Sequence, residues 1–258
     1  MDRLYGADVG SSRKLEVTKL RLDADKTASA TGGASTAESL PLVSLRDVSL
    51  GYDSAPIVHG VNLAIYPCKL IGLAGPNGSG KTTLFRTILG LLAPLRGDVF
   101  RNCPLSNFGY VPQSASLDPH FPLSVREVVE MGAYGRIRSY HLLPSEEKKR
   151  AMGVLDQVGM RHLLMKSFFA LSGGQKQRIL IARSLMVKPR IMILDEPLSG
   201  VDEDSRRTIT DLLISLTRQN GLAVFFSSHD LQMVQRVADQ IVRVDNGKIW
   251  VEERGDQS

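Results

Sequence analysis

Short apolar runs alternate with amphipathic stretches along most of this chain. Apolar and polar residues alternate over residues 43–50 and 57–65, a period of two that predicts half-buried strands. Residues 69–74 and 190–194 are almost wholly apolar, which predicts strands buried on both faces. The same patterns predict helices over residues 81–92, 144–158, 175–186, 204–218 and 231–238, and further strands over residues 223–227, 240–244 and 248–251.

Strands that alternate with helices predict an α/β fold with a mostly parallel sheet covered on both faces. The first two strands follow one another without a helix, so we also expect an antiparallel portion. Residues 1–40 differ from the rest, because small polar residues such as those at 27–38 have nothing to bury. We expect a disordered N-terminal tail there, with an over-extended gene start as the open alternative. The folded domain is expected over residues 41–253, followed by a short tail over residues 254–258.

Composition narrows the classes of function. No apolar run approaches the roughly 20 residues of a spanning helix, and the start lacks a signal-peptide core, so we expect a cytoplasmic chain. The net charge of +5 suits anionic partners, or reflects an ordinary excess of Lys and Arg. Aromatic residues make up only 6% and no dense basic run occurs, so no nucleic-acid partner is expected. Cys68 and Cys103 fit no metal-binding spacing and are predicted to be free thiols in a reducing compartment.

A phosphate-binding loop is predicted between the strand at 69–74 and the next helix. The string GPNGSGKT follows the pattern G-x-x-x-x-G-K-[ST]. Its glycines allow backbone N–H groups to surround an anion, and the helix start adds its positive end. Lys81 is predicted to reach the β- and γ-phosphates, and the Thr82 hydroxyl to coordinate Mg²⁺. The predicted nucleotide-binding residues of the loop are Gly75, Pro76, Asn77, Gly78, Ser79, Gly80, Lys81, Thr82 and Thr83.

Two carboxylates follow the buried strand at 190–194. Ligands of open α/β sheets sit at the carboxyl ends of strands, so Asp195 is expected beside the phosphate loop, holding Mg²⁺ directly or through water. Glu196 is expected near the γ-phosphate, where a carboxylate can polarise an attacking water. Read alone, this acidic pair would be a polar strand end that caps a turn, and the phosphate loop favours the catalytic interpretation.

The string LSGGQ at residues 171–175, between the phosphate loop and the acidic pair, resembles the signature of ABC transporter ATP-binding subunits. The resemblance runs from about residue 41 to 253. It implies a P-loop NTPase (ABC ATPase) core with a mostly parallel sheet, an antiparallel β subdomain and an α-helical signature subdomain over about residues 114–172. One departure is Pro67-Cys68-Lys69, where the family often has a Gly-Glu pair.

The resemblance also implies roles for individual residues. Gln113 resembles the Q-loop glutamine, expected to arrange Mg²⁺ together with Thr82 and Asp195. His229 resembles the switch histidine, in contact with the γ-phosphate, and Glu196 would be the general base. Further nucleotide-binding positions implied by the family are Tyr52 under the adenine, the signature residues Ser172, Gly173, Gly174 and Gln175, and Asp202 of the D-loop.

A second phosphate-binding helix start, at the signature, suggests two half-sites. The family arrangement is a head-to-tail dimer, so the implied partners begin with a second copy of this chain, each signature completing the other copy's site. The implied ligands are ATP and Mg²⁺. An integral membrane permease is implied as a further partner, and an extracytoplasmic metal-binding receptor through it. The chain would then be peripheral, on the inner face of the plasma membrane.

Residues 114–135 give the one indication of what is transported. They contain FPLSV and VVEMGAYG, which are similar to segments of zinc, manganese and iron importer ATPases. Import of a divalent metal ion is therefore expected. The alternatives are an iron-chelate or cobalamin-type importer, an ABC ATPase acting on DNA or ribosomes, and a small-molecule kinase. DNA and ribosome ATPases usually carry a long insertion or two cassettes, and the signature argues against a kinase.

Overall fold

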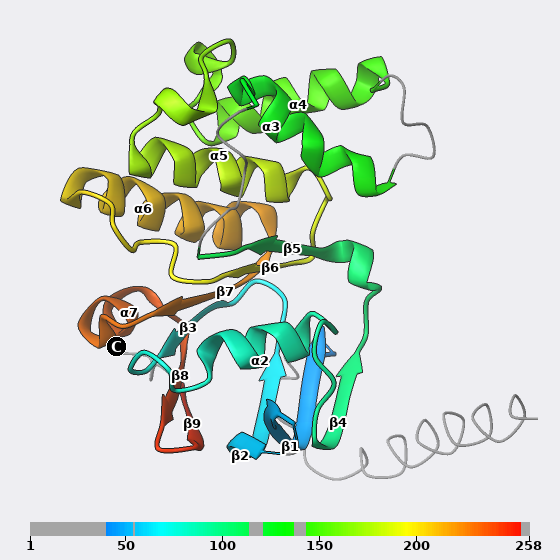
Figure 1. Cartoon of the computed structure of the whole chain (residues 1–258), viewed down its shortest axis with the longest axis vertical. Helices are drawn as coiled ribbons and strands as arrows, with labels where there is room; N and C mark the ends of the chain where they lie inside the picture. The colour runs from blue at the N-terminus through cyan, green and yellow to red at the C-terminus, as the bar shows by residue number, and fades with distance from the viewer. Residues whose placement is uncertain (1–39, 54, 114–120, 137–142, 254–258) are drawn as a thin grey trace, which may run out of the picture. The chain divides into compact units, whose positions relative to one another are not determined.

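The computed structural model describes residues 40–53, 55–113, 121–136 and 143–253 (Figure 1). The two predicted tails lie outside these residues, apart from Leu40, and so do residues 114–120 of the segment that resembles metal importers. Within the described ranges no helix is long and apolar enough to cross a membrane.

The larger sheet has six strands in the order β5-β6-β7-β3-β8-β9. All neighbouring pairs are parallel except β8 and β9, which are antiparallel, so the predicted mostly parallel sheet is confirmed. Because the order departs from the chain order, connections cross over the sheet. The strands are β3 (Leu70–Ala74), β5 (Phe108–Val111), β6 (Ile191–Leu194), β7 (Ala223–Ser228), β8 (Gln240–Asp245) and β9 (Lys248–Glu253).

The predicted antiparallel portion is a three-stranded sheet in the order β2-β1-β4. It consists of β1 (Val43–Tyr52), β2 (Ala55–Ile65) and β4 (Arg96–Arg101). The hydrophobic pattern did not predict β4, because this edge strand reads RGDVFR and is mostly exposed. It did not predict β5 either, a buried strand of only four residues.

Helices cover both faces of the larger sheet. Figure 1 shows α3, α4, α5 and α6 together on one side, and α2 on the other beside the three-stranded sheet. The helices are α2 (Lys81–Ile88), α3 (Val125–Glu130), α4 (Ser145–Gln157), α5 (Gly173–Leu185), α6 (Glu203–Asn220) and α7 (Leu231–Val237). Short 3₁₀ turns are η1 (Leu105–Asn107), η2 (Met131–Arg136), η3 (Arg161–Leu163) and η4 (Phe168–Ala170).

Capping residues account for two of the helix boundaries that differ from the sequence prediction. The helix expected over residues 81–92 ends at Ile88, because Gly90 takes a φ of 72° and the Leu91 N–H turns back to the Arg86 carbonyl. The helix expected from residue 175 begins two residues earlier, because Ser172 accepts a hydrogen bond from the backbone N–H of Gln175 and caps it.

The sheet separates two hydrophobic cores. Along β6, Met192 and Leu194 contribute to the core under α3–α7, while Ile191 and Ile193 contribute to the core shared with α2 and the three-stranded sheet. The residues of β7 divide in the same alternating way. Successive side chains of a strand point to opposite faces, so a strand buried on both faces is apolar throughout. This accounts for the uninterrupted apolar runs in the sequence.

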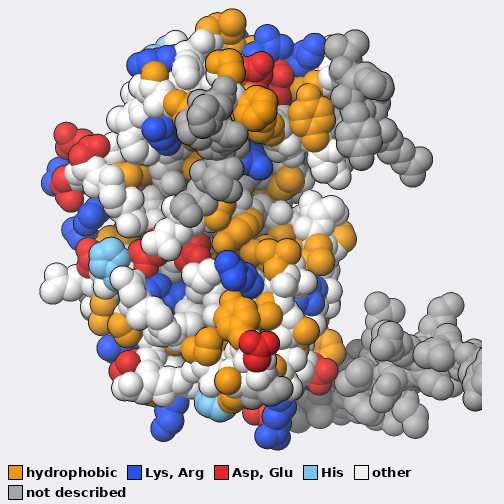
Figure 2. All heavy atoms as spheres, viewed as in Figure 1, with side chains coloured by type: hydrophobic (Ala, Val, Ile, Leu, Met, Phe, Trp, Pro, Cys, Tyr) orange, Lys and Arg blue, Asp and Glu red, His pale blue; other side chains and the backbone are white. Residues whose placement is uncertain are grey.

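Large hydrophobic side chains also remain on the surface. Figure 2 shows them gathered near the middle of one face, between the helices α3–α5 and the three-stranded sheet. Leu91 is 69% exposed, and Leu105 is also exposed. The Cδ1 atom of Leu105 lies 3.3 Å from where a Gly90 side chain would begin, so Leu105 lies close to the chain segment that carries Leu91. Exposed apolar surface of this kind is typical of a protein interface.

Phe85 ties the helix after the glycine-rich loop to the sheet. It is fully buried, and its ring meets that of Phe225 on β7 edge-to-face, with centroids 5.0 Å apart. We expect Phe85→Ala to lower the free energy of unfolding by about 3–5 kcal/mol, since it leaves a cavity between α2 and β7. Urea unfolding followed by circular dichroism measures this. Phe100→Ala is the control, because Phe100 is exposed and packs under Arg46, and it should cost less than about 1 kcal/mol. Equal losses for the two variants would contradict the prediction.

Candidate functional site

One cleft of about 450 Å³ brings together residues from four separate parts of the chain. The loop before α2 and the start of that helix form one wall, and the residues after β5 and β6 form the other. The residues that follow β3, β5 and β6 therefore meet at the carboxyl edge of the sheet, where ligands of such sheets bind. The lining residues are Ile57, Asn77, Gly78, Gly80, Lys81, Thr82, Thr83, Gln113, Asp195 and Glu196.

The loop conformation depends on glycine at two positions. Gly78 and Gly80 have φ angles of 79° and 105°, which L side chains rarely adopt. A β-carbon on Gly80 would also approach the Val58 Cγ2 atom to 2.8 Å. Lys81 follows as the first residue of α2, and its side chain folds back inside the loop. Its ammonium nitrogen donates to the carbonyl oxygens of Gly75 at 2.8 Å and Pro76 at 3.1 Å.

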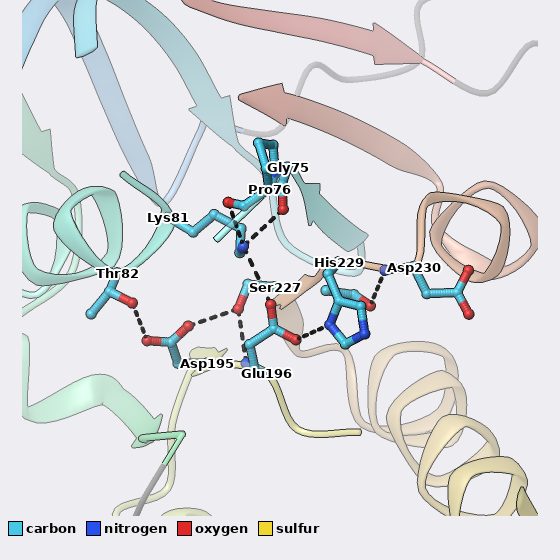
Figure 3. A network of polar contacts seen from close by, with 10 residues as sticks. Gly75, Pro76, Lys81, Thr82, Asp195, Glu196, Ser227, His229 and Asp230 are labelled. Atoms are coloured by element: carbon cyan, nitrogen blue, oxygen red, sulfur yellow. Dashed lines mark hydrogen bonds and ion pairs between the residues drawn. The ribbon is translucent and has the colours of Figure 1, made fainter. Parts of the chain in front are cut away.

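A chain of three polar side chains runs from the cleft to His229 (Figure 3). The Lys81 ammonium nitrogen lies 3.4 Å from Glu196 Oε1, and His229 Nδ1 lies 3.1 Å from Glu196 Oε2. The lysine and glutamate side chains are only 6% and 7% exposed, whereas that of His229 is 62% exposed. Glu196 has a φ of 49°, a left-handed backbone that glutamate seldom adopts. Strained backbone of this kind is often found at functional sites.

Asp195 lies beside this chain with both carboxylate oxygens occupied. The Thr82 hydroxyl donates to Oδ2 at 2.7 Å, and the Ser227 hydroxyl donates to Oδ1 at 2.8 Å. Asp195 is almost wholly buried. Its carboxylate acts electrostatically on Tyr110 of the neighbouring strand β5. Burial raises the pKa of the Tyr110 phenol above its ordinary value, and the Asp195 carboxylate raises it further, against a smaller lowering by Arg86.

Sequence reasoning did not predict Ser227. Its position follows from the strand register, because β6 and β7 are parallel and Leu194 pairs with Phe226. The next residues, Asp195 directly after β6 and Ser227 within β7, then lie side by side. A polar residue directly after the apolar run of β7 was therefore a candidate partner for the carboxylate.

The signature residues do not line this cleft within one chain. Ser172 is the N-cap of α5, in a capping box in which its backbone N–H donates to Gln175 Oε1 at 3.1 Å. Ser172 and Gly173 are exposed at this helix start. A side chain on Gly174 would come within 2.2 Å of the Ser205 hydroxyl, so α5 begins in close contact with α6.

Asp202 and Tyr52 also lie outside the residues that line the cleft. Asp202 caps α6 and accepts hydrogen bonds from the Ser205 backbone and hydroxyl at 2.9 and 2.8 Å. These bonds lower the pKa of the Asp202 carboxyl. The Tyr52 hydroxyl accepts from Arg86 of α2 at 3.2 Å. Gly75 and Pro76 line a second cavity, of about 650 Å³, together with His229 and Trp250.

The cleft carries the donors that a small hard cation prefers. A carboxylate on Asp195, a hydroxyl on Thr82 and a side-chain amide on Gln113 are all oxygen ligands, and Mg²⁺ takes oxygen ligands, often with substrate phosphates among them. The described residues contain no group of three or more His, Cys, Asp or Glu that could hold a metal on its own. The oxygen ligands present fit a cation that is also coordinated by phosphate oxygens.

Comparison with known proteins identifies the family of this chain. The sequence profile of the family described as ABC transporter matches residues 58–199. The zinc import ATP-binding protein ZnuC of Pseudomonas aeruginosa is 38% identical over 201 residues, which cover 78% of this chain and 70% of that protein. The ZnuC protein of Yersinia enterocolitica is 37% identical over 201 residues, covering 78% of this chain and 75% of its own.

Solved structures share the fold. The structure of cbiO1 from Clostridium perfringens, part of the ABC transporter complex cbiONQ, has a TM-score of 0.73 and 28% identity, covering 83% of this chain and 89% of that one. The ATP-binding cassette MJ0796, in a dimeric post-hydrolysis state bound to ADP and Pi, has a TM-score of 0.71 and 28% identity, covering 83% and 99%. Since the family profile spans more than half of the 258 residues, this chain belongs to the ABC transporter family, as an ATP-binding and ATP-hydrolysing subunit.

Proposed function

We propose that this chain hydrolyses MgATP in the cleft described above and thereby powers import of a divalent metal ion, zinc foremost, through a membrane permease. The observation that carries the ATPase part is the convergence of the buried side chains of Lys81, Asp195 and Glu196 in one cleft. The metal part is supported by the ZnuC relatives, whose names give zinc import as their activity.

The loop holds the phosphates in this proposal. Backbone N–H groups of residues 77–83 and the positive end of α2 face the triphosphate, together with the Lys81 ammonium group. Triphosphate oxygens would compete with Glu196 for that ammonium group, because it lies 3.4 Å from the carboxylate. The Tyr52 ring lies under the adenine.

Thr82, Gln113 and Asp195 are the residues that would hold Mg²⁺. The ion, when bound, neutralises charge on the phosphate oxygens. Glu196 accepts the proton of the attacking water as general base. His229 orients the Glu196 carboxylate, which it contacts at 3.1 Å, and its exposed ring reaches the γ-phosphate.

Two substitutions separate the roles of the acidic pair. We expect Glu196→Gln to lower the ATP turnover rate by about 100-fold or more, since the amide cannot accept the proton, while ATP still binds. We expect Asp195→Asn to raise the Mg²⁺ concentration needed for half-maximal turnover. Phosphate release gives the turnover rate and its dependence on Mg²⁺ concentration. Binding of a fluorescent nucleotide shows whether ATP still binds. The control is Asp211→Asn, an exposed carboxylate on α6. A Glu196→Gln protein with undiminished turnover would refute the general-base assignment.

The exposed start of α5 supports a head-to-tail dimer. Ser172, Gly173, Gly174 and Gln175 present a helix N-terminus that lies outside the cleft of its own chain. In the dimer this helix start faces the γ-phosphate bound by the other copy, and Asp202 lies at the contact between the copies. The similar cassette MJ0796 is dimeric in its post-hydrolysis state.

Charge at the α5 cap tests the dimer. We expect Ser172→Asp in a Glu196→Gln background to remain monomeric with MgATP, because the carboxylate repels the partner's γ-phosphate. Ser172→Asn is the matched control, since both residues cap helices well and only one is charged. Light scattering with and without MgATP gives the mass. Dimers of the Ser172→Asp protein at the same ATP concentration would contradict the arrangement.

The remaining partners follow from the family. The exposed surface near Leu91 and Leu105 is proposed to contact the permease, since exposed apolar patches favour protein partners. An extracytoplasmic metal-binding receptor would deliver the ion to that permease. The chain would then sit on the inner face of the plasma membrane without entering it.

Uptake by cells tests the cargo. In a strain that lacks its own copy of the gene, we expect a Lys81→Ala chain to restore neither ATPase activity nor accumulation of radioactive zinc. Lys149→Ala, an exposed lysine on α4, is expected to restore both. Uptake of manganese, iron, an iron chelate and cobalamin is measured in parallel. Restoration of chelate or cobalamin uptake without metal-ion uptake by the unaltered chain would favour the alternative cargo.

A further inference from the structure

We propose that Ser227 is a positioning residue that holds both carboxylates of the site in their working geometry. It lies at the end of β7, one residue before the last residue of that strand, and it is fully buried. The proposal deepens the function argued above, and it rests on Asp195 serving the cation and Glu196 serving the water.

The hydroxyl of Ser227 bridges two consecutive residues of the neighbouring strand end. It donates to Asp195 Oδ1 at 2.8 Å and accepts from the backbone N–H of Glu196 at 2.8 Å (Figure 3). A serine hydroxyl has one donor and two acceptor positions. Its single proton is therefore committed to Asp195, and one acceptor position to Glu196.

The bond to Glu196 acts where the backbone is strained. Glu196 has a φ of 49°, and relaxation of that angle would move its side chain away from Lys81 and His229. A fixed acceptor on the Glu196 N–H opposes this movement. Ser227 thus acts on the general base through the backbone.

The bond to Asp195 acts on the other carboxylate. Thr82 and Ser227 occupy different oxygens of this group, Oδ2 and Oδ1. Thr82 is also a candidate ligand of the cation, so its hydroxyl must serve two partners. Ser227 is not a candidate ligand of the cation, so its proton stays with Asp195 and keeps that carboxylate oriented. Hydrogen-bond partners of a ligating carboxylate commonly change metal affinity or activity by about 10–100-fold when they are removed.

The neighbouring serine, Ser228, makes different hydrogen bonds. Ser228 is also buried, but its hydroxyl accepts from the Asp230 backbone N–H at 3.0 Å and so supports the turn that carries His229. The bridge between the Asp195 carboxylate and the Glu196 backbone N–H is therefore made by Ser227 and not by Ser228.

The experiment compares Ser227→Ala, Ser227→Cys and Ser227→Thr in the purified full-length chain. Cysteine keeps the size but is a weak hydrogen-bond donor, and threonine keeps the hydroxyl. Two readouts are the turnover of ATP and the affinity for Mn²⁺ in the presence of a non-hydrolysable ATP analogue, measured by electron paramagnetic resonance. Binding of the analogue without metal is the third readout. The control is Ser184→Ala, which removes another buried serine hydroxyl, one that donates to a backbone carbonyl on α5.

We expect the alanine and cysteine variants to lose about tenfold or more in turnover and in Mn²⁺ affinity, with metal-free binding of the analogue unchanged. Threonine should retain both properties within about threefold, as should the Ser184→Ala control. Circular dichroism and thermal melts restrict the comparison to folded protein.

Unchanged turnover and Mn²⁺ affinity in folded Ser227→Ala and Ser227→Cys proteins would overturn the inference, even if both melt at lower temperature. In that case the unaltered chain would still hydrolyse ATP, and the proposed function would stand. Absence of ATP hydrolysis by the unaltered chain would instead overturn the proposed function, and the role of Ser227 with it.

Discussion

The parallel hydrogen bonding of β6, β7 and β3 is the constraint on which this site depends. Strands that run in one direction end at one edge, and the register fixes which residues meet there. Asp195 comes after β6, the last residues of β7 lead to His229, and the loop that carries Lys81 comes after β3. Three segments far apart in the sequence are thereby brought within hydrogen-bonding distance before any nucleotide is considered.

Burial then makes the charges depend on one another. Lys81 and Glu196 are both nearly removed from solvent, where an unpaired charge is costly. Each is the ion-pair partner of the other, and His229 extends the pair toward the surface. A bound triphosphate enters a site in which the Lys81 ammonium group is already paired with Glu196, and its oxygens must take over part of that pairing. The strained backbone of Glu196 indicates that the fold holds this arrangement against a local preference.

Local patterns predicted much of this protein, and pairing between distant segments accounts for what they missed. The phosphate loop, the acidic pair and the buried strands β3 and β6 were recognisable because glycine spacing and apolar runs have direct physical causes. The strand β4 was missed because its exposed residues carry no hydrophobic alternation. Ser227 was missed because its importance depends on the register of β6 against β7, which no single segment specifies. The end of α2 depended on one glycine with positive φ.

The close approach of Gly174 to Ser205 has a mechanical consequence. Space for no more than a hydrogen atom separates the first turn of α5 from that of α6 at this point. Ser205 is also the residue whose hydroxyl and N–H hold Asp202. A displacement of Asp202 would therefore reach α5 through Ser205, which contacts both Asp202 and Gly174. We therefore expect the starts of α5 and α6 to shift together.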